Sequence, residues 1–183
     1  MNNLPILAIT MGDPAGVGPE IIAMSLATPE PYAICRPLVV GDAAMMELGV
    51  KSAKVELKVR SIAQVEEAKY EQGTIDVLDL KLIDPSTFAY GEVSAQCGNA
   101  AFEAVRKAIE LAMKGEVDGT VTAPLNKEAL HVAGHNFAGH TEIYAHYTDT
   151  KKYAMLLADD KMRVIHVSTH VSLREACDRA KKE

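Results

Sequence analysis

The stretch Leu4–Ala27, LPILAITMGDPAGVGPEIIAMSLA, decides the fold of this chain of 183 residues. Its first part, Leu4–Thr10, is a continuous apolar run without polar alternation, which is typical of a strand covered on both faces. A glycine-rich turn follows, and Ile21–Ala27 is predicted to be a buried helix that stops before Pro29. A strand, a tight turn and a helix in this order indicate an α/β protein.

The glycine-rich turn has both a structural and a ligand-binding interpretation. Gly12, Gly16 and Gly18 permit positive φ and a tight path, and Pro19 suits the first helical position. Free N–H groups at a helix start also attract anions. However, Ile21 stands where a dinucleotide fingerprint has its third glycine, and Pro19 stands where a P-loop has its lysine. We therefore favour a structural tight turn over a phosphate cradle.

The rest of the chain alternates in the same manner. Strands are predicted at 38–40, 55–59, 74–80 and 119–122, and a hairpin at 153–158 and 162–168. Helices are predicted at 43–48, 94–114, 126–132, 141–147 and 172–182, with Gly49 ending the first, Ser94 capping the second and Ser172 opening a capping box with Glu175. Strands separated by helices predict a parallel α/β sheet.

Composition and charge exclude several classes of protein. A formal net charge of −6 argues against nucleic-acid binding, which needs clustered Lys and Arg. No window reaches the roughly 18–20 apolar residues of a membrane span. The odd set Cys35, Cys97 and Cys177 fits reduced thiols rather than disulfides. We expect a soluble, cytoplasmic protein that binds neither nucleic acid nor membrane.

The histidines gather in one part of the chain, since four of the six fall between positions 131 and 146. His131 and His135 are four residues apart, a spacing that can place two imidazoles on one helix face for zinc. Gly134 breaks the helix between them, and no acidic third ligand is properly placed. We interpret both as surface or capping histidines.

The tripeptide His140-Thr141-Glu142 follows Gly139, which lets the backbone turn. Thr141 is a candidate cap of the next helix, and Glu142 lies in its first turn. A helix N-terminus with an imidazole and a hydroxyl beside it suits a phosphate or carboxylate on a small substrate. A simple helix cap explains the same residues, and spacing alone leaves both interpretations open.

His166 and His170 flank a Ser-Thr pair and would share one face of an extended strand. Ligands of α/β sheets bind where strands end, so His170 is the better candidate for a metal ligand. His166 is predicted to be a packed or hydrogen-bonded strand histidine. A single histidine cannot hold a metal, so further ligands must come from elsewhere or from a second chain.

Four motifs together resemble a known family. They are GDPAGVGPE (Gly12–Glu20), TAPLNKEAL (Thr122–Leu130), GHTE (Gly139–Glu142) and STHVSLRE (Ser168–Glu175). In this order they resemble the N-terminal half of the 4-hydroxythreonine-4-phosphate dehydrogenases. The segment TAPLNKEALHVAGH is most similar to the branch that acts on D-threonate or D-erythronate 4-phosphate.

The resemblance implies an isocitrate/isopropylmalate-dehydrogenase-like α/β/α sandwich and a homodimer with its active site at the interface. It implies NAD-dependent oxidative decarboxylation of a phosphorylated hydroxy acid, with a divalent metal (zinc, magnesium or cobalt). His140 and Thr141 match the family's substrate-binding pair, and His170 matches the first of three metal-binding histidines. Asn126 and Lys127 are nearby polar candidates, and no residue is assigned to catalysis or to NAD binding.

Members of this family are nearly twice as long, so we expect a truncated chain. On this expectation residues 1–125 form a first α/β domain and residues 126–183 begin a second, metal- and substrate-binding domain. We expect the chain alone to be inactive. Two alternatives remain: a related decarboxylating dehydrogenase with another acid substrate, and a non-catalytic phosphate- or nucleotide-binding half-domain.

Overall fold

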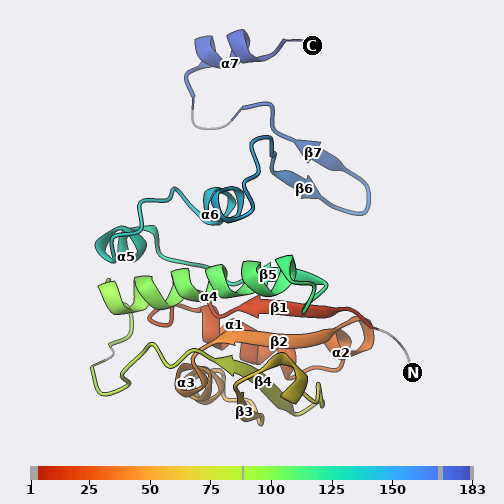
Figure 1. Ribbon diagram of the computed structural model, residues 1–183, viewed down its shortest axis with the longest axis vertical. Helices are drawn as coiled ribbons and strands as arrows, with labels where there is room; N and C mark the ends of the chain where they lie inside the picture. The colour runs from red at the N-terminus through yellow and green to blue at the C-terminus, as the bar shows by residue number, and fades with distance from the viewer. Residues whose placement is uncertain (1–3, 88, 169–170, 182–183) are drawn as a thin grey trace. The chain divides into compact units, whose positions relative to one another are not determined.

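The computed structural model describes residues 4–87, 89–168 and 171–181 (Figure 1). The chain divides into two compact units, Met1–Thr148 and Asp149–Glu183, and each is described by itself. The boundary predicted between residues 125 and 126 concerns the domains of a complete enzyme and stays a prediction. Among the described helices, none is long and apolar enough to cross a membrane.

The first unit is built on a parallel sheet of five strands in the order β3-β4-β2-β1-β5. The strands are β1 (Ile6–Thr10), β2 (Arg36–Gly41), β3 (Lys58–Ile62), β4 (Thr74–Asp79) and β5 (Gly119–Thr122). The predicted parallel α/β sheet is confirmed. The third strand begins three residues later than predicted, because the preceding helix runs to Ala53 and Lys54 then takes the left-handed conformation.

Helices cover both faces of the sheet. Ile9, Val39 and Val77 pack with α1 (Gly18–Leu26) and α3 (Ala43–Ala53). The alternate strand residues Ala8, Val40 and Leu78 pack with α4 (Ala95–Met113). Figure 1 shows α4 and α3 on opposite sides of the strands. Successive side chains point to opposite faces, so continuous apolar strands produce an α/β/α sandwich. Short elements complete this part: α2 (Glu30–Ile34) and the 3-10 turn η1 (Val65–Glu67).

Helix α4 has a second packing face, away from the sheet. Phe102, Val105 and Ile109 form a separate apolar cluster with Leu130 and Ile143. Those last two residues belong to α5 (Lys127–Val132) and α6 (His140–Tyr147). The predicted caps of α4 are confirmed. The Ser94 hydroxyl accepts from the Cys97 N–H at 3.2 Å, and Gly115 follows the helix with φ of 72°.

The glycine-rich turn between β1 and α1 uses its glycines in different ways. Gly12 has φ of 74°, as predicted, whereas Gly16 and Gly18 do not have positive φ. At Gly18 the constraint is space, because a Cβ there would overlap the carbonyl oxygen of Met11. A Cβ at Gly16 would lie 3.4 Å from its nearest neighbour, the Asp13 carbonyl oxygen. The turn therefore needs glycine at Gly12 for conformation and at Gly18 for close approach.

Gly49 does not end the helix that follows β2, contrary to the prediction. Helix α3 continues through Gly49 to Ala53. A Cβ on Gly49 would lie 2.6 Å from Cβ of Pro19, so the glycine lets α3 pack closely against α1. Tertiary packing at this position outweighs the usual weakness of glycine in a helix.

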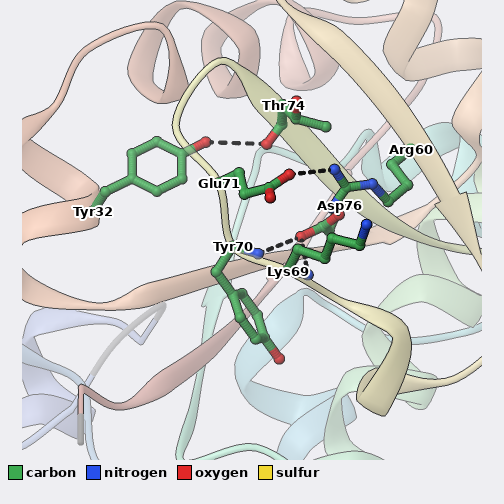
Figure 2. Close-up of polar contacts among 7 residues, drawn as sticks. All are labelled: Tyr32, Arg60, Lys69, Tyr70, Glu71, Thr74 and Asp76. Atoms are coloured by element: carbon green, nitrogen blue, oxygen red, sulfur yellow. Dashed lines mark hydrogen bonds and ion pairs between the residues drawn. The ribbon is translucent and has the colours of Figure 1, made fainter. Parts of the chain in front are cut away.

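A buried carboxylate holds the connection between β3 and β4 (Figure 2). Asp76 is 2% exposed and accepts from the backbone N–H groups of Lys69 and Tyr70 at 2.9 and 2.7 Å. It also accepts from Nη1 of Arg60 at 2.9 Å, and Arg60 reaches the exposed Glu71 with its other nitrogen. These bonds satisfy a buried charge, so this cluster is structural.

The second unit contains a short antiparallel hairpin and one helix. Strands β6 (Leu156–Ala158) and β7 (Arg163–Ile165) confirm the predicted hairpin, and all six of their residues are exposed. Helix α7 (Leu173–Arg179) is capped by the Ser172 hydroxyl, which accepts from the Glu175 N–H at 3.3 Å. The carboxylate of Glu175 pairs with Arg179 at 2.6 Å.

Replacing Gly18 with alanine tests the close approach at the first turn. We expect Gly18→Ala to lower the free energy of unfolding by about 2 kcal/mol or more, because the new methyl group must displace backbone atoms. Gly16→Ala is the matched control and should change it by less than about 1 kcal/mol. Urea denaturation of the 183-residue chain measures both, and equal stability of the two variants would contradict this account.

Candidate functional site

The start of helix α6 has no side-chain cap. The helix begins at His140, one residue earlier than predicted, and Thr141 therefore lies in the first turn and is not the N-cap. The N-cap is Gly139, in an extended conformation with φ of 167° and without a side-chain cap bond. The first N–H groups of a helix have no acceptor within the helix, and their partial positive charge attracts anions. This end suits an anionic group of a ligand.

One ring nitrogen of His140 is buried and has no hydrogen-bond partner among the described residues. Its Nε2 atom is inaccessible to solvent, and no group within the described residues forms a hydrogen bond with it. Burial lowers the pKa of the His140 imidazole below its ordinary value of 6.5. The ring is therefore neutral near pH 7, with one nitrogen available as donor and the other as acceptor. Buried polar atoms nearly always have partners, so an unpartnered one is a candidate ligand contact.

Lys127 and Glu142 flank this helix start. The Cε atom of Lys127 lies 3.8 Å, and the Oε2 atom of Glu142 3.7 Å, from the position that a Cβ would take on Gly139. Lys127 is exposed, so its ammonium group can meet an anion from solvent. Glu142 adds a negative charge, which favours a ligand that also carries hydroxyl groups.

The neighbouring Asn126 serves as a helix cap. Its side-chain oxygen accepts from the backbone N–H groups of Glu128 and Ala129 at 2.9 and 3.1 Å, which makes it the N-cap of α5. The prediction of a polar role near the site thus separates into two parts. Asn126 starts the helix, and Lys127 extends toward α6.

The loops at the carboxyl ends of the strands connect this region to the sheet. The N–H of Asp13 donates to the Pro124 carbonyl at 2.9 Å, which joins the turn after β1 to the loop after β5. The Asp13 carboxylate accepts from the Ala15 N–H at 2.9 Å, and burial raises the pKa of this carboxyl. Burial likewise raises the pKa of Asp42, which accepts from the Leu82 N–H at 2.7 Å. These buried acids fix loops that surround the carboxyl edge of the sheet.

His131 and His135 both take part in structural contacts. His131 is exposed, as predicted, whereas His135 is half-buried and packed rather than a surface or capping residue. Nε2 of His131 pairs with the Phe137 carbonyl oxygen at 3.0 Å. Nε2 of His135 pairs with Oδ1 of Asn99 at 3.0 Å, and its ring stacks on Phe102 with centroids 3.6 Å apart. Burial lowers the pKa of His135, so this ring is packed as a neutral group.

The predicted metal ligand lies outside the described residues. Nothing is known of the structure at His170, and its role stays a prediction. His166 was predicted to be a packed or hydrogen-bonded strand histidine, but it follows the end of β7 and is exposed, like the residues of the hairpin strands. Within residues 4–87, 89–168 and 171–181, no three His, Cys, Asp or Glu side chains are grouped to hold a metal.

Two small hollows lie away from α6. One, of about 100 Å³, is lined by residues of the glycine turn and α3, among them Gly16, Pro19 and Gly49. The other, of about 260 Å³, lies between η1 and α4 and includes Gln64 and Lys107. Neither is lined by His140, Thr141 or Lys127.

The sequence reasoning did not single out Tyr144. Its hydroxyl donates to Oγ1 of Thr120 on β5 at 2.8 Å. The spacing of four residues from His140 was the available signal, because it places both side chains on one face of α6.

Comparison with known proteins settles the family. The sequence profile described as "Pyridoxal phosphate biosynthetic protein PdxA" matches residues 33–183. The chain belongs to the PdxA family. This membership confirms the resemblance drawn from the four sequence motifs.

Individual members of the PdxA family are similar along almost the entire chain. D-threonate 4-phosphate dehydrogenase of Cupriavidus necator is 47% identical over 173 residues, which are 94% of this chain and 52% of that protein. The crystal structure of a 4-hydroxythreonine-4-phosphate dehydrogenase from Burkholderia phymatum is 49% identical, with a TM-score of 0.89 over 95% of this chain and 52% of that chain. The enzyme of the same name from Klebsiella pneumoniae is 45% identical, with a TM-score of 0.89 over 97% and 54%.

These matches confirm the predicted α/β/α fold and extend it to the arrangement of the elements. The chain spans about half the length of the relatives that it matches. A site that draws on the other half of those proteins is therefore seen here only in part.

The buried state of His140 predicts its titration. Because the folded chain holds the neutral ring, the unfolded chain binds more protons between the folded pKa and 6.5. The free energy of unfolding should therefore fall as the pH drops below 6.5 through this window. We expect the His140 Cε1–H resonance to titrate with a midpoint below 6.5, with His140→Gln assigning the signal. A midpoint at or above 6.5 would show that the ring is solvated.

Proposed function

We propose that a full-length protein containing this chain is an NAD-dependent dehydrogenase that oxidises and decarboxylates a phosphorylated hydroxy acid. D-threonate 4-phosphate is the first candidate, because the relative that acts on it is 47% identical over 94% of the chain. The related substrate 4-phosphooxy-threonine is the second candidate. The observation that carries the proposal is the buried, unpartnered Nε2 of His140 at the uncapped start of α6.

In this proposal the start of α6 binds the substrate's phosphate. Because Nε2 of His140 is closed to solvent in the chain as described, substrate binding must first expose this nitrogen. Nε2 and the hydroxyl of Thr141 then donate hydrogen bonds to phosphate oxygens, and the first N–H groups of the helix add their partial positive charge. The ammonium group of Lys127 supplies a full charge from α5. Glu142, which lies near the same position beside Gly139 as Lys127, accepts from a hydroxyl of the same substrate. Holding the phosphate in this manner orients the distant reacting hydroxyl.

A neutral His140 can fill this role. A neutral ring donates through Nε2 when its proton is on that atom, and it needs no counter-ion in a buried place. Burial of the ring, which lowers its pKa, keeps this state at physiological pH. The phosphate then provides the partner that the nitrogen lacks among the described residues.

The described residues do not fit a divalent metal by themselves, since no group of three ligand side chains occurs among them. We retain His170 as a proposed ligand of zinc, magnesium or cobalt, with its other ligands supplied from outside the chain. The glycine-rich turn after β1 lacks the glycine fingerprint of dinucleotide-binding folds, and no residue of the chain is assigned to NAD binding.

A homodimer with the active site at the subunit interface, and a cytoplasmic location, are parts of the same proposal. The homodimer derives from the family resemblance, and the cytoplasmic location derives from the composition and the odd number of cysteines. The acidic charge of −6 fits a small-molecule enzyme and is unsuited to nucleic-acid binding.

Steady-state kinetics of the full-length enzyme tests the proposal. We expect NAD reduction with D-threonate 4-phosphate, and none from the 183-residue chain alone under the same conditions. His140→Ala should raise the KM for the phosphorylated acid about 10- to 100-fold, the range of one hydrogen bond to a charged group, and leave the KM for NAD unchanged.

Other outcomes separate the alternatives. Turnover of another hydroxy acid only would support a related dehydrogenase. Binding of phosphorylated acids or NAD without turnover, in both the chain and the full-length protein, would support a non-catalytic module. An unchanged KM in His140→Ala would remove His140 from the substrate site.

A further inference from the structure

Helix α6 is held by apolar packing, by ring contacts of His146 and Tyr147 with Phe137 and Phe102, and by one side-chain hydrogen bond to strand β5. Ile143 is fully buried and packs in the apolar cluster with Phe102 and Leu130. Apolar packing is non-directional, so it holds the helix against α4 without fixing its rotation closely. The hydroxyl of Tyr144 donates to Oγ1 of Thr120 at 2.8 Å, and a hydrogen bond is directional. Among these contacts, this bond links the face of α6 that carries Tyr144 directly to strand β5.

His140 and Tyr144 lie on the same face of α6. They are four residues apart, so their side chains are neighbours on the helix surface. Both are covered: burial lowers the pKa of His140 and raises that of Tyr144. The Tyr144 hydroxyl therefore keeps its proton and remains a donor. Any rotation that releases Tyr144 from Thr120 also turns the imidazole of His140.

Strand β5 is connected both to α6, through Tyr144, and to Lys127, through the chain. Thr120 lies in β5, and the same segment leads through Pro124 to Lys127 at the start of α5. The strand itself is fixed by its parallel pairing with β1. Through Tyr144, the start of α6 takes its orientation from the strand that also positions Lys127. A helix of eight residues cannot hold its own conformation in water, so these tertiary contacts decide its placement.

We propose that Tyr144 is a positioning residue for substrate binding, whose hydroxyl, bound to Thr120, directs His140 and Thr141 toward the phosphate. This inference rests on the proposed function, because it requires that His140 and Thr141 contact the substrate. It adds that affinity for the phosphorylated acid depends on a hydrogen bond that touches no substrate atom. The phosphate is not the reacting group, so the effect belongs to binding rather than to the chemical step.

Kinetics of the full-length enzyme provides the test. Tyr144→Phe should raise the KM for D-threonate 4-phosphate roughly 3- to 10-fold, the range of one net hydrogen bond, with kcat and the KM for NAD unchanged. Thr120→Val should do the same, and the double variant should be no worse than either single one, because both remove the same bond. Thr120→Ser keeps an acceptor hydroxyl at this position and should therefore have the wild-type KM.

Tyr147→Phe is the matched control on the same helix and should leave all three constants unchanged. In the 183-residue chain, Tyr144→Phe should also shift the His140 Cε1–H resonance, which reports the ring's position without any turnover. Tyr147→Phe should leave that resonance in place.

Three results would overturn the inference. A loss of unfolding free energy in Tyr144→Phe with an unchanged KM would show that the bond is only structural. Additive effects of Tyr144→Phe and Thr120→Val would show that they do not act through one bond. A raised KM in His140→Ala together with a normal KM in Tyr144→Phe would reject the positioning role alone. A normal KM in His140→Ala would remove His140 from the substrate site, and a full-length enzyme without NAD reduction would reject the proposed function itself.

Discussion

The close approach of backbone to backbone at the first turn organises this structure. At Gly18 a side chain would overlap the Met11 carbonyl, and at Gly12 it would overlap the Pro124 carbonyl. The chain can therefore leave β1, turn and enter α1 within a few residues, while the loop after β5 passes directly against it. The Asp13 N–H donates to Pro124 at this crossing. The segment that leads to Lys127 and α6 thus begins from a fixed point on the sheet.

From this fixed point the polar groups of the site gather at one helix end. The N-terminus of α6 has no side-chain cap, and His140 carries a buried nitrogen without a partner. Both features are unfavourable for the chain by itself, and both are removed when an anion binds there. Buried polar groups are usually satisfied, as the Asp76 carboxylate is (Figure 2). Among the described residues, the buried side-chain atoms without a partner are Nε2 of His140 and Oγ1 of Thr10. Of these two, only the nitrogen of His140 lies at the start of a helix, where an anion can bind.

The sequence predicted the features that depend on neighbouring residues. Hydrophobic runs located the strands, Ser94 and Ser172 located two helix starts, and the paired apolar runs after Thr148 located the hairpin. It was wrong where a distant contact decides the outcome. Gly49 was predicted to end a helix, but it lies inside the helix and allows close packing against Pro19. Thr141 was predicted to be a helix cap, but the helix starts one residue earlier.

The bond from Tyr144 to Thr120 joins residues 24 positions apart, and no local sequence pattern predicts it. The pairing of His140 with Thr141 came from a motif, and the buried, unpartnered state of His140 came only from the fold.

A crystal structure of the full-length enzyme with D-threonate 4-phosphate tests the central claim most directly. The account predicts a phosphate oxygen within hydrogen-bonding distance of the Nε2 atom of His140, at about 2.7–3.2 Å, with the other phosphate oxygens facing the first turn of α6 and Lys127. A phosphate bound elsewhere, with Nε2 of His140 paired to a protein group from the second half of the enzyme, would contradict it.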